Sequence, residues 1–264
     1  MNASISNGSG SPDSGKPDIP VQSDLLGPLD KIAQATQSPI VDLPSKFMID
    51  PQTYKTGGEL GFSGMDFYVA GRGGALGDVA AGVVTAAFFF FNPELIAETW
   101  SRSAPVMPRN QAAEEFARCA HRWAEDHLPD SPSYERINWL LSRIAAPVNP
   151  AGAPLFAGWM TLSEPQSPKA LAIHRLNGLR ELRGAYHIAS IMAQDVLPRE
   201  AVAIKTSFML GIYGWGETEI TEDLPNDSWQ RAEASTNRLM GRVFEVLDDT
   251  ERGELVDLLN EISE

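Results

Sequence analysis

The stretch from Lys169 to Asp195 repeats its apolar residues at helical intervals, and this spacing limits the possible folds more than any other feature. Residues spaced in this way share one face of an α-helix, which can then pack against a core. Two other stretches, Asn110 to His127 and Ser133 to Ala145, show similar patterns. No segment has the strict alternation that a half-buried strand requires. The sequence therefore predicts an all-α, multi-helix fold.

The composition divides the chain into three parts. Residues 1–24 are rich in Ser, Gly, Asn, Asp and Pro. They bury too little apolar surface to offset the entropy of ordering, so we expect a disordered tail. Residues 25–63 are interrupted by Pro and Gly, which predicts an irregular lead-in with one or two short helices. Residues 64–264 are predicted to form the helical domain.

The longest apolar run, Val79 to Phe91, is much shorter than the roughly 20 residues that cross a bilayer. We expect a fully buried helix at the centre of the fold, and no membrane contact. The first twenty residues lack the basic start and apolar segment of a secretory signal. The one cysteine, Cys119, cannot form an internal disulfide. Together these features predict a cytoplasmic protein.

Acidic residues dominate the C-terminal end of the chain. The net charge is −14, and residues 216–264 hold fourteen acidic residues against four arginines. Nucleic-acid binding draws its affinity from neutralised phosphates. On this basis the sequence argues against nucleic acid as a partner. The last two amphipathic helices, 227–247 and 250–262, offer a surface for a homodimer or for another protein.

Metal and nucleotide motifs are missing from the sequence. Of the four histidines, His121 and His127 are six residues apart and do not share a helix face. We therefore expect no metal site, and the sequence leaves any cofactor unknown. The glycine-rich run Gly71 to Gly74 follows no predicted strand and lacks the lysine of a phosphate-binding loop. Its glycines are expected to allow close helix contact or a bend.

Two arginines, Arg72 and Arg183, are each followed by a glycine at the edge of a segment predicted to be buried. A buried guanidinium is costly unless it is paired. Two interpretations follow. Each arginine forms an internal ion pair, with Glu181, Asp78 or Glu59 as the candidate partners, or each binds an anionic ligand.

His187 lies four residues after Arg183 and so shares its helical face. Together with Arg180, Tyr186 and Tyr68, it could complete a pocket for a carboxylate, an enolate or a phosphate. In such a pocket His187 is the candidate general acid or base. The alternative is that His187 is a hydrogen-bonded core residue.

Three segments, 67–79, 87–95 and 179–189, resemble a family of all-α, helix-turn-helix-like proteins that is common in actinobacteria and has no assigned activity. The family pattern has a histidine where this chain has Leu182 and an aspartate where it has Ala185. The resemblance implies a helix-turn-helix-like arrangement of helices over 186–194 and 198–208. It also implies winged-helix-like elements.

The Arg-Gly pairs at 72–73 and 183–184 are each followed by small and apolar residues and then by a helix start that contains proline. They predict two related halves, 64–145 and 169–264, unless the likeness is a chance recurrence.

Our leading hypothesis is a protein that binds, or an enzyme that acts on, a partly apolar anionic small molecule. The alternatives are a winged-helix-like transcriptional regulator that binds DNA, and a scaffold that uses the acidic C-terminal helices.

Overall fold

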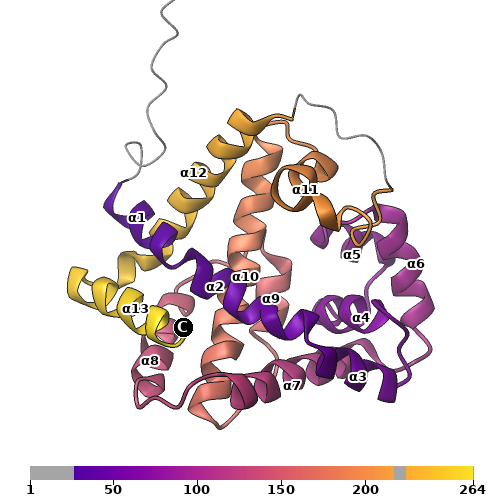
Figure 1. Ribbon diagram of the computed structural model, residues 1–264, viewed down its shortest axis with the longest axis horizontal. Coiled ribbons are helices and arrows are strands. Elements are labelled where there is room, and N and C mark those ends of the chain that lie inside the picture. The colour runs from indigo at the N-terminus through magenta and orange to yellow at the C-terminus, as the bar shows by residue number, and fades with distance from the viewer. Residues whose placement is uncertain (1–26, 217–223, 264) are drawn as a thin grey trace, which may run out of the picture.

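The computed structural model describes residues 27–216 and 224–263, and the tail predicted over residues 1–24 lies outside this part of the chain. The described residues form helices and their connections and contain no β-strand (Figure 1). The all-α, multi-helix prediction is confirmed. The two-halves prediction stays a prediction.

The helices follow one another with short connections. In chain order they are α1 (Pro28–Ala35), α2 (Gln37–Ser45), η2 (Lys46–Ile49), α3 (Pro51–Glu59), α4 (Asp66–Gly74), α5 (Ala81–Ala87), α6 (Pro93–Ser103), α7 (Arg109–His127), α8 (Tyr134–Ala145), α9 (Pro154–Trp159), α10 (Pro168–Met192), α11 (Pro198–Thr206), η3 (Ser207–Met209), α12 (Asn226–Val243), η4 (Phe244–Val246) and α13 (Asp249–Glu261).

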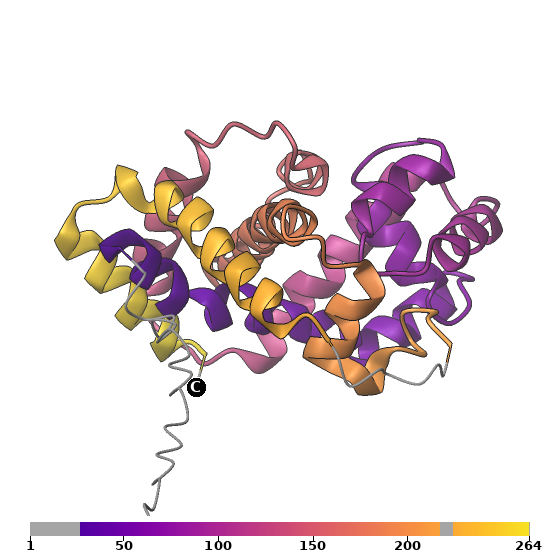
Figure 2. The ribbon, with the colours of Figure 1, turned by 90° about the horizontal axis from the view of Figure 1, so that it is seen from above.

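The 25-residue helix α10 is the axis of the fold. It begins at Pro168, which is tolerated at the first helical position, and the Ser167 side chain caps the backbone N–H of Ala170. Helices α2, α7, α8, α9 and α12 all pack against it. Figures 1 and 2 show α10 running through the middle of the molecule, with the other helices around it. The periodic pattern in the sequence thus marks the central element.

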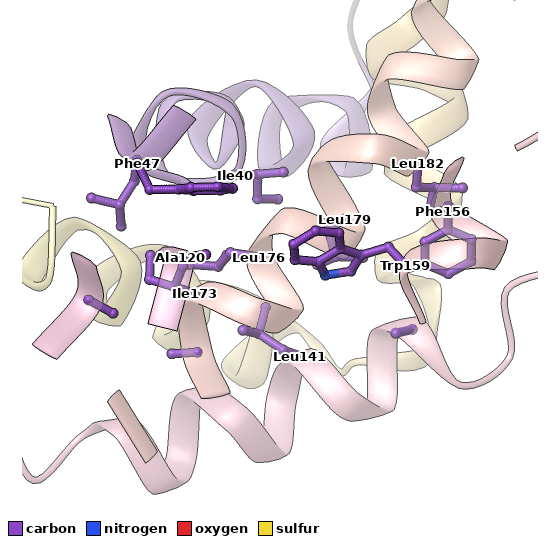
Figure 3. Packing of buried hydrophobic residues seen from close by; sticks show 14 of the residues in the cluster. Ile40, Phe47, Ala120, Leu141, Phe156, Trp159, Ile173, Leu176, Leu179 and Leu182 are labelled. Carbon is purple, nitrogen blue, oxygen red and sulfur yellow. The ribbon is translucent and has the colours of Figure 1, made fainter. Parts of the chain in front are cut away.

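One large hydrophobic core surrounds α10 and extends from α1 to the end of the chain's last helix. In Figure 3, Leu176 and Leu179 of α10 lie close to Trp159 of α9. The Trp159 indole also donates to the carbonyl of His174, so its one polar atom is satisfied. Ile40 of α2 and Phe47 of η2 belong to the same core.

The lead-in over 25–63, predicted as irregular with one or two short helices, contains three α-helices, α1, α2 and α3, and the short helix η2. Pro28 and Pro51 stand at the first positions of α1 and α3, where a missing N–H costs nothing. The Asp50 side chain accepts from the backbone N–H of Gln52 at 2.7 Å and caps α3. The prediction was wrong because these prolines start helices and do not break them.

The prediction of a fully buried helix over 79–91 was also wrong. Only α5, Ala81–Ala87, is helical there, and Val83 is 47% exposed. Phe88 and Phe91 are buried, but they follow the helix and reach the core from the next turn. The apolar run is therefore split between an exposed helical face and a buried turn. None of the described helices is long and apolar enough to cross a membrane.

Helix α4 continues through Gly71 and ends at Gly74, and both glycines allow close contact with α7. A Cβ atom on Gly71 would lie 2.5 Å from the Cβ of Phe116. A Cβ on Gly74 would overlap the carbonyl oxygen of Arg109. The predicted role of these glycines in close helix contact is confirmed, and the helix ends at the last of them.

We predict that Gly74→Ala lowers the free energy of unfolding by about 2 kcal/mol, because backbone atoms of α7 cannot move aside as a side chain can. Gly253→Ala is the matched control, since a Cβ on this α13 glycine meets nothing within 4 Å. That change should stabilise the protein by about 0.5–1 kcal/mol. Urea unfolding measures both effects. Equal stability of Gly74→Ala and the wild type would contradict the close packing of α4 on α7.

Candidate functional site

A buried ion pair joins Arg72 of α4 to Glu181 of α10. The Arg72 Nε donates to Glu181 Oε1 at 2.7 Å, and Nη2 donates to Oε2 at 2.8 Å. Arg180 Nη1 donates to the same Oε1 at 2.7 Å. Glu181 is only 3% exposed. Of the two interpretations of Arg72, the structure shows the internal ion pair, and Glu181 was among its predicted partners.

The surroundings keep the Glu181 carboxylate charged. Burial alone would raise its pKa, but the guanidiniums of Arg72 and Arg180 hold the pKa below its ordinary value. The Arg72 guanidinium also lies 4.5 Å from the centre of the Phe88 ring and donates to the Tyr68 hydroxyl at 3.3 Å. The carboxylate therefore binds both nearby arginines at once.

A second buried pair joins Arg183 of α10 to α12. Its Nη2 donates to Glu233 Oε2 at 3.1 Å and lies 3.4 Å from Asn237 Oδ1. Arg183 is 5% exposed, and its Nε has no hydrogen-bond partner in the structure. Glu233 was not among the candidate partners. The sequence did hold a sign of this pair: Glu233 is an acidic residue on the apolar face of an amphipathic helix. A carboxylate in such a position is rarely buried without a cationic partner.

His187 is hydrogen-bonded within the fold, as one interpretation of the sequence expected. Its Nδ1 lies 3.0 Å from Thr236 Oγ1, and that hydroxyl donates to the Ala232 carbonyl. The ring must therefore donate from Nδ1, which leaves Nε2 as the basic nitrogen, 3.6 Å from Glu233 Oε1. Burial lowers the pKa of His187 to about 4, so the ring is neutral near pH 7.

These groups border two adjoining chambers that share part of their lining, and together we call them the cavity. The first, which we call the apolar chamber, has a volume of about 510 Å³ and is lined by Val83, Ala86, Phe88, Leu155, Ala185 and Ile188. The second, the polar chamber, has a volume of about 290 Å³ and is lined by Tyr68, Arg180, Arg183, His187, Lys205 and Glu233. Both are bordered by Arg72, Phe90, Phe91, Glu181 and Gly184.

The cavity brings most of the predicted site residues together. Tyr68, Arg72, Arg180, Arg183 and His187 all border the polar chamber. Tyr186 does not: it is half-buried and packs against the main core instead. Helical position explains the difference. Consecutive residues of a helix point to different sides, so Tyr186 points away from the side on which its neighbour His187 borders the polar chamber.

The polar chamber carries a small excess of positive charge. Its cationic side chains are Arg72, Arg180, Arg183 and Lys205, and its carboxylates are Asp42, Glu181 and Glu233. With His187 neutral, four cations face three anions. Lys205 is exposed at the edge of α11.

The outward side of α12 presents a second charged feature. Arg231, Arg238 and Arg242 are seven and four residues apart, so they share one helical face, and all three are exposed. Arg231 donates to Gln194 and Ser228, and Arg238 donates to Ser235. Within the described part of the chain, no carboxylate lies within ion-pair distance of these three arginines, which we call the arginine face.

A family model described as a helix-turn-helix family matches residues 35–264. The chain belongs to this helix-turn-helix family. The family resemblance seen in the sequence is thereby confirmed at this level. Comparisons with curated proteins and with solved structures find no match.

Membership of a helix-turn-helix family indicates nucleic-acid binding, so the prediction against nucleic acid was wrong. That prediction used the charge summed over residues 216–264. In the structure the charges are separated. The exposed arginines lie on α12, whereas five of the acidic residues lie on α13, where Glu251 and Glu254 pair with Arg143 and Arg136 of α8. A summed charge does not describe a local surface.

The expected helix-turn-helix segment corresponds to the end of α10 and to α11. Helix α10 ends at Met192, the connection passes through Asp195 with φ of 56°, and α11 begins at Pro198. The left-handed conformation of Asp195 reverses the chain at this point.

Glu181→Gln should lower the free energy of unfolding by about 3–5 kcal/mol, because it leaves two guanidiniums near an uncharged partner in a buried site. The control is Glu164→Gln, which breaks a half-exposed pair with Arg175. There we expect a loss below about 1 kcal/mol. Chemical denaturation at pH 7 measures both. Similar losses in the two variants would show that the Glu181 pair is not buried as described.

The stability of the protein should fall between pH 6.5 and pH 4. Burial lowers the pKa of His121, His174 and His187 to about 4, whereas in the unfolded chain it lies near 6.5. Below pH 6.5 the unfolded state takes up protons that the folded state does not bind, so folding loses free energy until pH 4 is reached. One such histidine contributes about 2 kcal/mol between pH 7 and pH 5.

His187→Asn should therefore reduce the loss between pH 7 and pH 5 by about 2 kcal/mol relative to the wild type. Urea unfolding at the two pH values measures the difference. An identical loss in the variant would mean that His187 is accessible to protons in the folded protein.

Proposed function

We propose that this protein is a DNA-binding regulator that contacts DNA phosphates through the arginine face of α12. Two observations support the proposal: membership of a helix-turn-helix family, and three exposed arginines in one row. Helix α12 has 18 residues and so is about 27 Å long. Figures 1 and 2 show it along the outside of the molecule, where a duplex can approach.

Helix α11, the second helix of the expected motif, is less suited to contact DNA. Ala201, Val202 and Ala203 are buried against the rest of the protein. Ala201, Val202 and Lys205 also border the polar chamber. A helix that reads a groove presents polar side chains able to reach phosphates and base edges. The outward side of α12 has this character, so we assign DNA contact to α12.

The test replaces Arg231, Arg238 and Arg242 with serine in one variant. Fluorescence anisotropy with a pool of randomised duplexes should show binding by the wild type that weakens with salt. Each phosphate contact contributes about −0.9 to the slope of log K against log salt concentration. If all three arginines bind phosphates, the variant should have a slope less steep by about 3, and affinity should drop at low salt.

The matched control removes the same charge elsewhere, through Lys46→Ser, Lys55→Ser and Arg118→Ser. These exposed residues lie on η2, α3 and α7, at the other end of the molecule from α12 in Figure 1. The control should bind nearly as the wild type does. An equal loss in both variants, or no binding by the wild type, would refute the role of α12.

Small-molecule binding is a second proposed function, and the two chambers beside α10 favour it. Their volumes, about 510 and 290 Å³, are of the size of known ligand pockets. Native mass spectrometry of protein purified from cells should show added mass from a retained molecule. Catalysis by His187, a homodimer and a cytoplasmic location stay predictions.

A further inference from the structure

We propose that the cavity binds an amphiphilic carboxylate, with its apolar body in the apolar chamber and its acid group in the polar chamber. The proposal rests on the small-molecule-binding function proposed above and is independent of DNA binding. It names the chemical class of the ligand, the end of the cavity that receives each part, and the two cations that meet the acid.

The apolar chamber suits a hydrocarbon or aromatic body. Phe88, Leu155 and Ile188 supply large apolar surfaces, and Val83 of α5 completes the lining. Val83 is 47% exposed in the structure, so a body in this chamber would cover apolar surface that now faces water. Burial of that surface is the main source of affinity in this part of the cavity.

Arg183 and Lys205 are the cations available to an acid group. Arg72 and Arg180 share the Glu181 carboxylate, and each donates a further hydrogen bond, to Tyr68 and to Ser45, so several of their donors are already engaged within the fold. The Nε of Arg183 is buried and has no partner in the structure, and Arg183 borders the polar chamber. A buried donor without an acceptor is costly, and a ligand oxygen would remove that cost. Lys205, on the exposed side of α11, would add a second positive charge.

The charge balance selects a single negative charge. Four cations face three carboxylates in the polar chamber, so one added carboxylate makes the chamber neutral. A cationic ligand would add a fifth positive charge to a confined space. A dianion would leave one charge without a partner, which is costly away from water.

In this proposal the ligand passes from one chamber to the other beside Gly184. It borders both of them, and a Cβ on this residue would meet nothing within 4 Å. The space beside α10 is therefore open at this position. A ligand that occupies both chambers must run past Gly184, and a large side chain there would close the passage.

The test is isothermal titration calorimetry with three probes that share one apolar chain: decanoate, 1-decanol and decylamine, each below its micelle concentration. We expect decanoate to bind at least tenfold more tightly than 1-decanol, because a hydrogen bond to a charged group is worth more than one to a neutral group. Decylamine should bind more weakly than either.

Two variants locate the site. Gly184→Leu should abolish decanoate binding by closing the passage, and Gly253→Leu on the exposed side of α13 is its control. Lys205→Met should weaken decanoate several-fold and leave 1-decanol unchanged. Because Lys205 is exposed, this variant keeps the buried ion pairs and should fold like the wild type. Thermal unfolding followed by circular dichroism checks the fold of each variant.

The outcomes separate two kinds of failure. If 1-decanol binds as tightly as decanoate and Gly184→Leu abolishes both, the cavity binds ligands but the assignment of an acid group is overturned. If Lys205→Met changes the affinities of all three probes equally, the placement of the acid at Lys205 is overturned. If none of the probes binds to the wild type, the amphiphilic-carboxylate proposal is overturned. Added mass in the native spectrum, lost in Gly184→Leu, would then keep the small-molecule function and assign it to another ligand class.

Discussion

The buried pair between Arg72 and Glu181 is the interaction on which the arrangement of the site depends. It joins α4 to the central helix α10 through two short hydrogen bonds, and Arg180 binds the same carboxylate. Charges removed from water in this way are stable only when their partners are held in place. The close contact of α4 with α7, which Gly71 and Gly74 allow, supplies that rigidity. The pair also borders both chambers, so the same residues hold the helices together and shape the cavity.

Helix α12 connects the two proposed functions physically. Its inner side carries Glu233 and Thr236, which contact Arg183 and His187 of α10, and its outer side carries the arginine face. In the proposed complex an acid group at Arg183 Nε and Glu233 at Nη2 would share that guanidinium. The helix that would contact DNA thus also carries a residue that borders the proposed acid site, Glu233. Such a shared element is the physical basis on which binding at one site can change binding at another.

Charge shows how a sum over the sequence can mislead. Residues 216–264 are strongly acidic in total, and that total argued against nucleic acid. Folding separated the charges, because the arginines of α12 face outward while Glu251 and Glu254 of α13 meet arginines of α8. Likewise the apolar run from Val79 to Phe91 gave no sign that α5 would keep one exposed face. Whether an apolar residue is covered depends on which helices lie outside it, and this is a property of the assembled fold.

The sequence alone determined the all-α class, the approximate extent of the central helix α10 and the presence of Arg72 and Arg183 in buried surroundings; for Gly71 to Gly74 it left close helix contact and a bend as alternatives. These features follow from local spacing and side-chain size, which operate within a few turns of helix. Only the tertiary structure decided that Glu181 would pair with Arg72, that Glu233 would pair with Arg183, and that Tyr186 would point away from the cavity. The partners in the first two pairs are 109 and 50 residues apart in the chain. Contacts over such separations depend on how whole helices pack, and no local pattern in the sequence records that packing.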